Sequence, residues 1–281
     1  MKRFKRLLTS LVTASLLLSL NLFSFAQHNA QHQGQSASPD CQLPGGSAIS
    51  EGRTVYGEPK PIGNGDMRSW VRLNKAGKPV AVGIALSESA LTGLPLELPN
   101  GEMGVEYVLH FPKSAPVAPF NHIGVNWNPK GHPPEHIYNV GHFDFHFYMI
   151  SESERAAITA QGEDLERCKK KPADEFVPQD YFYAPETEHA NMGSHWVDKN
   201  AHEFHGHHFT STMIYGSYNG HFTFIEPMIT KAFIESKPCF SQPVKQPAKF
   251  EKAGYYPTSY SIQFDPVNKV YNIALDNLTW R

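Results

Sequence analysis

Cysteine is scarce in this sequence of 281 residues, which contains only Cys41, Cys168 and Cys239. No two of them form a CxxC pair, so a cysteine-based zinc site and thioredoxin-like chemistry have no support. In an oxidising compartment, three cysteines allow one disulfide and leave one thiol. The spacing does not determine the pairing; we expect Cys168 to pair with Cys239.

Several catalytic signatures are also missing. The sequence has no GxSxG nucleophile elbow, no Walker A loop and no dinucleotide-binding glycine pattern after a strand. The stretch "AHEFHGHH" (201–208) is close to the zincin pattern HExxH, but Gly206 stands where that pattern needs its second histidine. These absences argue against serine-hydrolase, nucleotide-binding and zincin functions, and residues 201–208 are expected to form an exposed loop.

The first 26 residues have the pattern of a secretory signal peptide. Basic residues at 2, 3, 5 and 6 precede an apolar stretch that runs from Leu7 to Phe25, and Ser24-Phe25-Ala26 ends it with small residues. We therefore expect cleavage near Gln27 and an exported protein, periplasmic or extracellular, with no membrane attachment afterwards. Residues 27–51 begin with the polar stretch "QHNAQHQGQSASPD", which predicts a disordered leader.

No excess of positive charge is present. Removal of the four basic residues of the signal peptide leaves 21 basic against 27 acidic residues, a formal net charge of −6. A protein of this sign has no general attraction for nucleic acid or for anionic lipid. Nucleic acid is therefore not an expected partner.

From residue 52 onward, short segments rich in β-branched and aromatic residues alternate with Gly, Pro and Asn. This pattern predicts an all-β domain over residues 52–236, mainly an antiparallel sandwich or barrel with one or two short helices. Residues 237–281 are expected to form a linker and a C-terminal β-hairpin, which either completes the main sheet or stands as an appendage. The predicted strands include "SWVRL" (69–73), "VAVGIAL" (80–86), "VEYVLHF" (105–111), "HIGVNW" (122–127) and "HFDFHFYMI" (142–150).

Two local signals fix the ends of particular elements. Ser151 and Glu154 fit a capping box, which predicts a helix that begins before "RAAITAQ". Asn219-Gly220 is the favoured two-residue type I′ turn of a β-hairpin, because both positions tolerate a positive φ.

That turn also predicts a register for the hairpin, with Tyr218 opposite His221, Gly216 opposite Thr223 and Met213 opposite Glu226. The period of two then places a lone carboxylate among apolar side chains. The predicted face consists of Met213, Tyr215, Phe222, Phe224, Glu226 and Met228.

Histidine is unevenly distributed, since 13 of the 15 histidines lie between His110 and His221. In the extended stretch "HFDFHFYMI", His142, Asp144 and His146 share one face and three phenylalanines share the other. A buried phenylalanine face makes the opposite face a buried or half-buried polar row. Histidines four residues apart on a strand are about 13 Å apart, so Asp144 and one neighbouring histidine are the expected ligand pair. An ordinary strand with a wet polar face is the competing interpretation.

Other residues could complete a metal site. His195 lies shortly after a glycine in "NMGSHWVD", and the alternative to a ligand role is a loop residue that caps the local backbone. Glu226 is the lone acid of the predicted hairpin face, and its alternative is a buried acid paired with Arg or His. His122, His132 and His136 precede the central strand, and the rigid turn 131–134 could aim His132 or His136 at the same place. We therefore predict metal ligands among His142, Asp144, His146, His195 and Glu226.

The motifs together resemble a known family. "PIGNGDMRSWVRL", "SESALTGLP", "WNPKGHPPEHIYNVGHFDFHFYMI", "MGSHWVD" and "FTSTMIYGSYNGHFTFIEPMIT" resemble exported bacterial proteins classed as a domain of unknown function, with a Thermus envelope-stress-regulon protein as a structurally studied relative. The resemblance covers residues 52–236. It implies an all-β domain and homo-oligomers, and it supplies no established reaction. Gly141 stands where the family has proline before the HFDFHFY strand.

Two functions follow from these residues. In the first, the protein holds one transition metal, Zn²⁺, Mn²⁺ or Fe²⁺, because mixed nitrogen and carboxylate ligands suit these ions, and an activated water acts as in a hydrolase on a small-molecule ligand. In the second, it is a non-enzymatic, oligomeric envelope or stress-response binding protein whose His-Asp-His row is structural.

Overall fold

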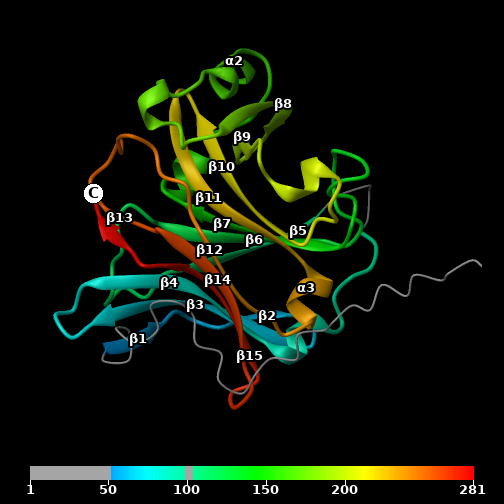
Figure 1. Cartoon of the computed structure of the whole chain (residues 1–281), viewed down its shortest axis with the longest axis vertical. Helices are drawn as coiled ribbons and strands as arrows, with labels where there is room; N and C mark the ends of the chain where they lie inside the picture. Colours follow the sequence, from blue (N-terminus) through cyan, green and yellow to red (C-terminus); the bar gives the residue numbers. More distant parts are fainter. Residues whose placement is uncertain (1–51, 99–103) are drawn as a thin grey trace, which may run out of the picture. The chain divides into compact units, whose positions relative to one another are not determined.

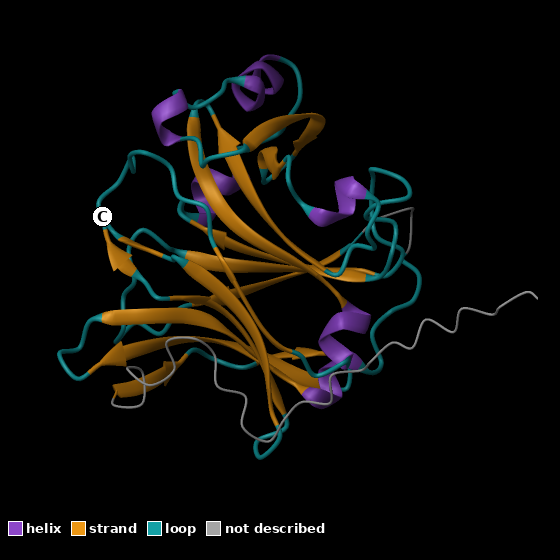
Figure 2. Ribbon diagram, in the orientation of Figure 1, coloured by secondary structure: helices purple, strands orange, loops and turns teal. Residues whose placement is uncertain are grey.

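Two large antiparallel sheets form the framework of the described chain. A computed structural model describes residues 52–98 and 104–281, so the predicted signal peptide and leader lie outside it. All strand pairs in the described ranges are antiparallel. They form two seven-stranded sheets and one two-stranded sheet (Figures 1 and 2). The predicted all-β class is confirmed.

The first sheet has the order β1-β3-β4-β15-β14-β12, with β2 paired to β3. The predicted C-terminal hairpin forms β14 and β15, and β15 pairs with β4, so the hairpin completes this sheet. The strands of the first sheet are β1 (Gly52–Tyr56), β2 (Lys60–Ile62), β3 (Gly65–Asn74), β4 (Pro79–Ser87), β12 (Cys239–Pro243), β14 (Ser259–Asp265) and β15 (Val270–Asp276).

The second sheet has the order β5-β6-β7-β11-β10-β9-β8, and "HFDFHFY" forms its strand β7 between β6 and β11. A small third sheet pairs β13 (Tyr255–Tyr256) with β16 (Thr279–Trp280). The strands of the second sheet are β5 (Val105–His110), β6 (His122–Asn128), β7 (His142–Tyr148), β8 (Tyr181–His189), β9 (Gly193–Asp198), β10 (Ser211–Tyr218) and β11 (His221–Thr230).

Helices are few and short in the described residues. Helix α1 (Glu152–Ala156) begins with the predicted capping box, in which the Ser151 side chain accepts from the Glu154 amide and the Glu154 side chain accepts from the Ser151 amide. Helices α2 (Glu163–Lys169) and α3 (Lys231–Glu235) are not among the elements predicted from the sequence. No helix in the described ranges is long and apolar enough to span a membrane.

The core lies between the two large sheets. Alternate residues of β3, β4, β14 and β15 pack in one buried cluster with alternate residues of β6, β7, β10 and β11. The phenylalanine face of β7 contributes Phe143, Phe145 and Phe147, none of which is exposed. The period of two therefore sends the other side chains of β7 to the opposite face of the second sheet.

The β10–β11 hairpin differs from its predicted register. The turn itself is as expected, because Tyr218 pairs with His221, and Asn219 and Gly220 have φ values of 50° and 83°. A register shift follows at Thr223, so Gly216 pairs with Phe224 and not with Thr223.

The extra residue of this β-bulge reverses which face every later residue of β11 occupies. Met213 pairs with Pro227, whereas Glu226 pairs with Ile214. Met213, Tyr215 and Phe222 share one face, as predicted, and this face packs in the core. The prediction that Phe224, Glu226 and Met228 share that face is wrong.

The expected Cys168–Cys239 disulfide is also wrong. Cys168 is a free, buried thiol, whereas Cys239 is disulfide-bonded. Cys168 lies in α2, which contacts β9 and β10 of the second sheet, and Cys239 begins β12 at the edge of the first. Disulfide formation requires Cα atoms within about 7 Å, a condition that sequence spacing alone does not reveal.

Candidate metal centre

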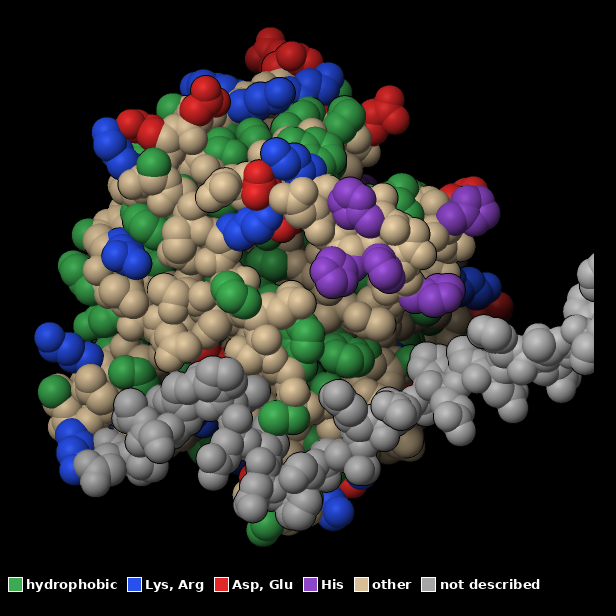
Figure 3. Space-filling model, viewed as in Figure 1, with side chains coloured by type: hydrophobic (Ala, Val, Ile, Leu, Met, Phe, Trp, Pro, Cys, Tyr) green, Lys and Arg blue, Asp and Glu red, His purple; other side chains and the backbone are tan. Residues whose placement is uncertain are grey.

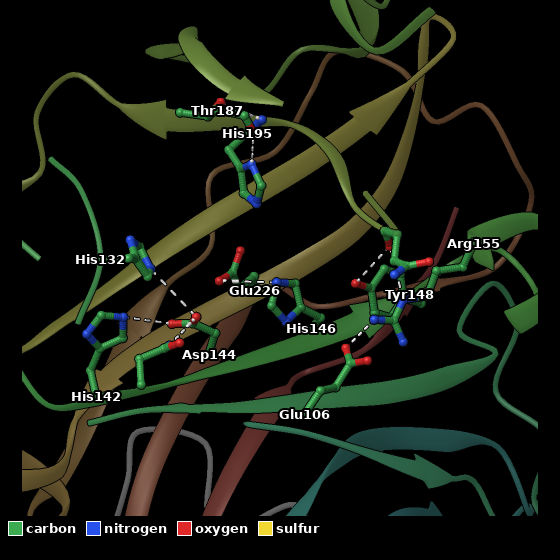
Figure 4. Close-up of polar contacts among 12 residues, drawn as sticks. Glu106, His132, His142, Asp144, His146, Tyr148, Arg155, Thr187, His195 and Glu226 are labelled. Carbon is green, nitrogen blue, oxygen red and sulfur yellow. Dashed lines mark hydrogen bonds and ion pairs between the residues drawn. The ribbon is translucent and has the colours of Figure 1, made fainter. Parts of the chain in front are cut away.

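Strand β7 is buried on both faces. All seven of its residues are buried, including His142, Asp144 and His146. We call the face of the second sheet opposite the core the polar face; it carries these three residues together with His195 of β9 and Glu226 of β11 (Figure 4). Burial of ionisable groups is costly unless they find partners, so the contacts on this face decide what it can do.

His132, His142 and Asp144 form the first cluster, which we call the Asp144 triad. Each residue offers one ligand atom, and these atoms lie within 4.8 Å of one another. His142 Nε2 lies 3.1 Å from Asp144 Oδ1, and His132 Nε2 lies 3.6 Å from Asp144 Oδ2. His132 comes from the loop between β6 and β7, whereas the other two lie on β7.

The protonation of these two histidines is fixed by backbone carbonyls. His142 Nδ1 lies 2.7 Å from the Val140 oxygen, and His132 Nδ1 lies 2.8 Å from the Pro133 oxygen. A carbonyl oxygen only accepts, so both Nδ1 atoms must donate, and in a neutral ring Nε2 is then an unprotonated lone pair. Both lone pairs point at a carboxylate, which also only accepts.

Asp144 is held in place by one amide. Asn128 Nδ2 donates to Asp144 Oδ2 at 2.7 Å, while His142 Nε2 and Asp144 Oδ1 have no hydrogen-bond partner among the described residues. Burial by itself raises the pKa of Asp144, but the adjacent His142 and His132 outweigh it and hold that pKa below its usual range. Burial by itself lowers the pKa of His132, and the Asp144 carboxylate reverses this and raises it.

His146, His195 and Glu226 form the second cluster, which we call the Glu226 triad. Its ligand atoms also lie within 4.8 Å of one another, and His146 Nε2 is 3.4 Å from Glu226 Oε1. His195 Nδ1 lies 2.7 Å from the Thr187 carbonyl oxygen, so it donates there and leaves Nε2 unprotonated in the neutral ring. His146 Nδ1 and Glu226 Oε2 are buried without a hydrogen-bond partner in the described part of the chain.

Burial dominates the electrostatics of the Glu226 triad. It lowers the pKa of His146 to about 3 and that of His195 to about 4, so both rings are neutral at pH 7. Burial, together with the charge of Asp144, raises the pKa of Glu226 well above its usual range. Neutral imidazole is the form that binds a metal, whereas a buried neutral glutamic acid would ionise beside a cation.

Aromatic side chains cover the Asp144 triad. The ring of Phe209 lies 5.4 Å from that of His142 and 4.9 Å from that of Tyr138, whose hydroxyl donates to Glu203. Glu203 belongs to the short 3₁₀ helix η5 (His202–His205), and residues 202, 205, 207 and 208 are exposed histidines, as the loop prediction required. Figure 3 shows histidine side chains grouped on one part of the surface.

The structure thus brings the five predicted ligands to one face but into two clusters. His142 and His146 belong to different clusters, as the rise of a strand requires. His132, named only among the loop alternatives, joins Asp144, and its signal was the rigid turn at 131–134. His136 is exposed, and His122 stacks on Tyr148 with ring centroids 4.8 Å apart, so neither joins a triad.

Comparison with known proteins gives one match. The family described as TTHB210-like, hypothetical protein TTHB210, matches residues 74–127, less than half of the chain. The matched segment contains β4, β5 and most of β6, together with the "SESALTGLP" motif, but none of the residues of the two triads. No curated protein and no solved structure matches the chain.

Proposed function

We propose that this chain is an exported metalloprotein that binds a divalent transition-metal ion at the Asp144 triad and uses it for hydrolytic chemistry. The observation that carries the proposal is the convergence of two imidazole Nε2 atoms, whose Nδ1 atoms donate to backbone carbonyls, on one carboxylate in a buried place. Such groups repel one another unless a cation or a proton lies between them. The N-terminal signal pattern supports export.

The distances suit a metal ion. Zinc bonds of about 2.0–2.2 Å in a tetrahedral arrangement place the ligand atoms roughly 3.3–3.6 Å from one another. In the Asp144 triad, the 3.6 Å between His132 Nε2 and Asp144 Oδ2 falls within this interval, and the 3.1 Å between His142 Nε2 and Asp144 Oδ1 is slightly shorter. Backbone carbonyls that orient the far side of each histidine are the usual outer partners of metal-binding imidazoles.

The kind and number of ligands favour reactive chemistry over a purely structural role. Structural zinc sites are closed by four protein ligands, whereas two histidines and one carboxylate leave a coordination position open. In such a site the ion lowers the pKa of a bound water and supplies a nucleophile at neutral pH. Manganese and ferrous iron accept the same ligand set.

Access to the triad is from the side of His132. Its side chain is 24% exposed, compared with 0% for His142 and 7% for Asp144. A water or a small anionic ligand can therefore reach the ion beside His132, while His142 and Asp144 stay fixed by Val140 and Asn128.

A non-enzymatic function is the second candidate, and one observation favours it. At 3.1 Å, His142 Nε2 and Asp144 Oδ1 are also close enough for an imidazolium–carboxylate ion pair, in which a proton takes the place of the metal. The polar face would then be a structural network in an oligomeric envelope protein.

Metal analysis separates the two candidates. The mature chain would be purified without a histidine tag or chelator, reconstituted with Zn²⁺, Mn²⁺ or Fe²⁺ and dialysed. We expect at least about one equivalent of metal per chain, and less than about half an equivalent would contradict the proposal.

The matched variants are Asp144→Asn, which removes a ligand charge, and Asp276→Asn, which removes the buried carboxyl of the first sheet. Only Asp144→Asn should lose metal. Hydrolysis of chromogenic phosphate and carboxylate esters by the loaded protein, abolished by chelation and by Asp144→Asn, tests the reaction. Full metal binding without hydrolysis of any ester would leave the binding function and remove the enzymatic one.

A further inference from the structure

The Glu226 triad repeats the features that mark the Asp144 triad, at a neighbouring place on the same face. Each contains two histidines and one carboxylate, and each set of ligand atoms lies within 4.8 Å. In Figure 4 the two lie side by side along the sheet, with Asp144 and Glu226 as the adjacent carboxylates. Asp144 pairs with Met228, two residues beyond Glu226 on β11.

The orientation of the side chains points to a ligand between them. His146 Nε2 lies 3.4 Å from Glu226 Oε1, a separation within the roughly 3.3–3.6 Å expected between ligands of one zinc ion. The Thr187 carbonyl holds His195 at Nδ1 and thereby presents its Nε2, as Val140 does for His142. Glu226 Oε2 and His146 Nδ1 have no partner among the described residues, although both are buried.

A single ion cannot serve both triads. His142 and His146 are about 13 Å apart along β7, whereas metal bonds to such ligands are about 2.0–2.2 Å long, so one ion cannot bind both. The two histidines also belong to different clusters. One ion at the Asp144 triad would leave the buried Glu226 and His146 and the half-buried His195 as a set of ligands with nothing to join them.

We propose that the Glu226 triad is a second site for a divalent transition-metal ion, so that the protein carries a two-ion centre along β7. This inference deepens the proposed function and rests on it. The carboxylates of Asp144 and Glu226 lie adjacent between the two positions, where they offset the repulsion between the cations. With six protein ligands for two ions, positions remain open for water or for an anionic ligand that contacts both.

The test is the number of ions per chain. Tag-free protein is loaded with Zn²⁺, dialysed and analysed by elemental mass spectrometry, and Co²⁺ loading is followed by its visible absorption. We expect about two equivalents for the unmodified chain, about one for Glu226→Gln and about one for Asp144→Asn. If Glu226→Gln folds poorly, His195→Gln takes its place, because it alters another ligand of the same triad. His195→Gln should also bind about one equivalent.

Surface histidines are the main source of error, so a variant with asparagine at positions 202, 205, 207 and 208 serves as the control and should keep two equivalents. A value of about one for the unmodified chain or for this control overturns the second site and leaves the proposed function intact. A value near zero overturns both. Loss of no ion from Glu226→Gln or His195→Gln also overturns the assignment, because the second ion would then lie elsewhere.

Discussion

The two large sheets have the same size and the same strand pairing, yet their faces away from the core differ. On the first sheet this face is built from Trp70, Ala81, Ala85 and Ala274, and its buried acid Asp276 accepts a hydrogen bond from Ser261 on the neighbouring strand. On the second sheet the equivalent face carries two triads of histidine and carboxylate.

The difference lies in how each buried acid is satisfied. Asp276 has a hydroxyl donor directly beside it, so its environment is complete without any further group. Asp144 Oδ1 lies 3.1 Å from His142 Nε2 and Glu226 Oε1 lies 3.4 Å from His146 Nε2, and each acid keeps one carboxylate oxygen without a hydrogen-bond partner among the described residues. A buried acid alone is therefore weak evidence for a site, whereas buried imidazoles gathered around an incompletely hydrogen-bonded carboxylate favour a cation.

The largest expected effect is a contrast between the two sheets. Asp144→Asn should be about 3–5 kcal/mol less stable than the metal-loaded unmodified chain, because the buried site loses the carboxylate that balances the charge of the ion. Asp276→Asn should cost about 1 kcal/mol, the value of one hydrogen bond. Urea unfolding at pH 7 measures both, and equal losses would remove the distinction between the faces.

Chelation is expected to act on the second sheet alone. When the free metal concentration is one hundred times the dissociation constant, binding adds about 2.7 kcal/mol to the free energy of unfolding. This corresponds to a melting temperature roughly 5–10 °C higher for a domain of this size. EDTA should therefore lower the melting temperature of the unmodified chain and of Asp276→Asn alike. The double variant Asp144→Asn, Glu226→Gln should not respond, and a response would place the stabilising ion outside the triads.

Acid should weaken the second sheet through His122, which lies on the polar face outside both triads. Burial, helped by the charge of Arg155, lowers the pKa of His122 to about 4. A lowered histidine pKa gives stability that is complete above the unfolded value near 6.5 and is lost as the pH falls from there toward 4. Between pH 7 and pH 5, the free energy of unfolding of the metal-free unmodified chain should fall by about 2 kcal/mol more than that of metal-free His122→Asn. Parallel pH profiles from urea unfolding would exclude this contribution.

The smallest effect is expected for the hydroxyl that completes the first sheet. Ser261→Ala should cost about 1 kcal/mol at pH 7 and less at pH 4. Burial raises the pKa of Asp276, and the hydrogen bond from Ser261 opposes this increase. Loss of the hydroxyl therefore destabilises the ionised carboxylate more than the protonated acid. The loss of stability becomes smaller as the pH falls toward the pKa of Asp276, because more of the carboxyl is then protonated. Metal content should not change, and a change would couple the two sheets.

The sequence predicted those features that depend on neighbours in the chain. The strands, the capping box of Ser151 and Glu154, and the Asn219-Gly220 turn follow from local propensity and period. The alternation in "HFDFHFY" correctly predicted one core face and one buried polar face for β7. The five candidate ligands do share that polar face.

The bulge at Thr223 could not be predicted from the alternation of residues along the strand. In the uninterrupted register Glu226 would face the core with Met213, but one extra residue turns it toward His146. Nothing in the alternation of β11 marks that residue, because the shift arises from pairing with β10. The contact of His132 with Asp144 and the absence of a disulfide at Cys168 likewise depend on segments that are distant in sequence.

The sequence by itself therefore determined the strands, the chemical kinds of candidate ligand and the strand that carries three of them, because period and composition act over a few residues. Only the tertiary structure decided that the candidate ligands form two triads and that a loop histidine completes the first. The reason is geometric: a metal site needs atoms within a few ångströms, and that proximity is set by strand pairing, a bulge and a loop, none of which the local pattern encodes.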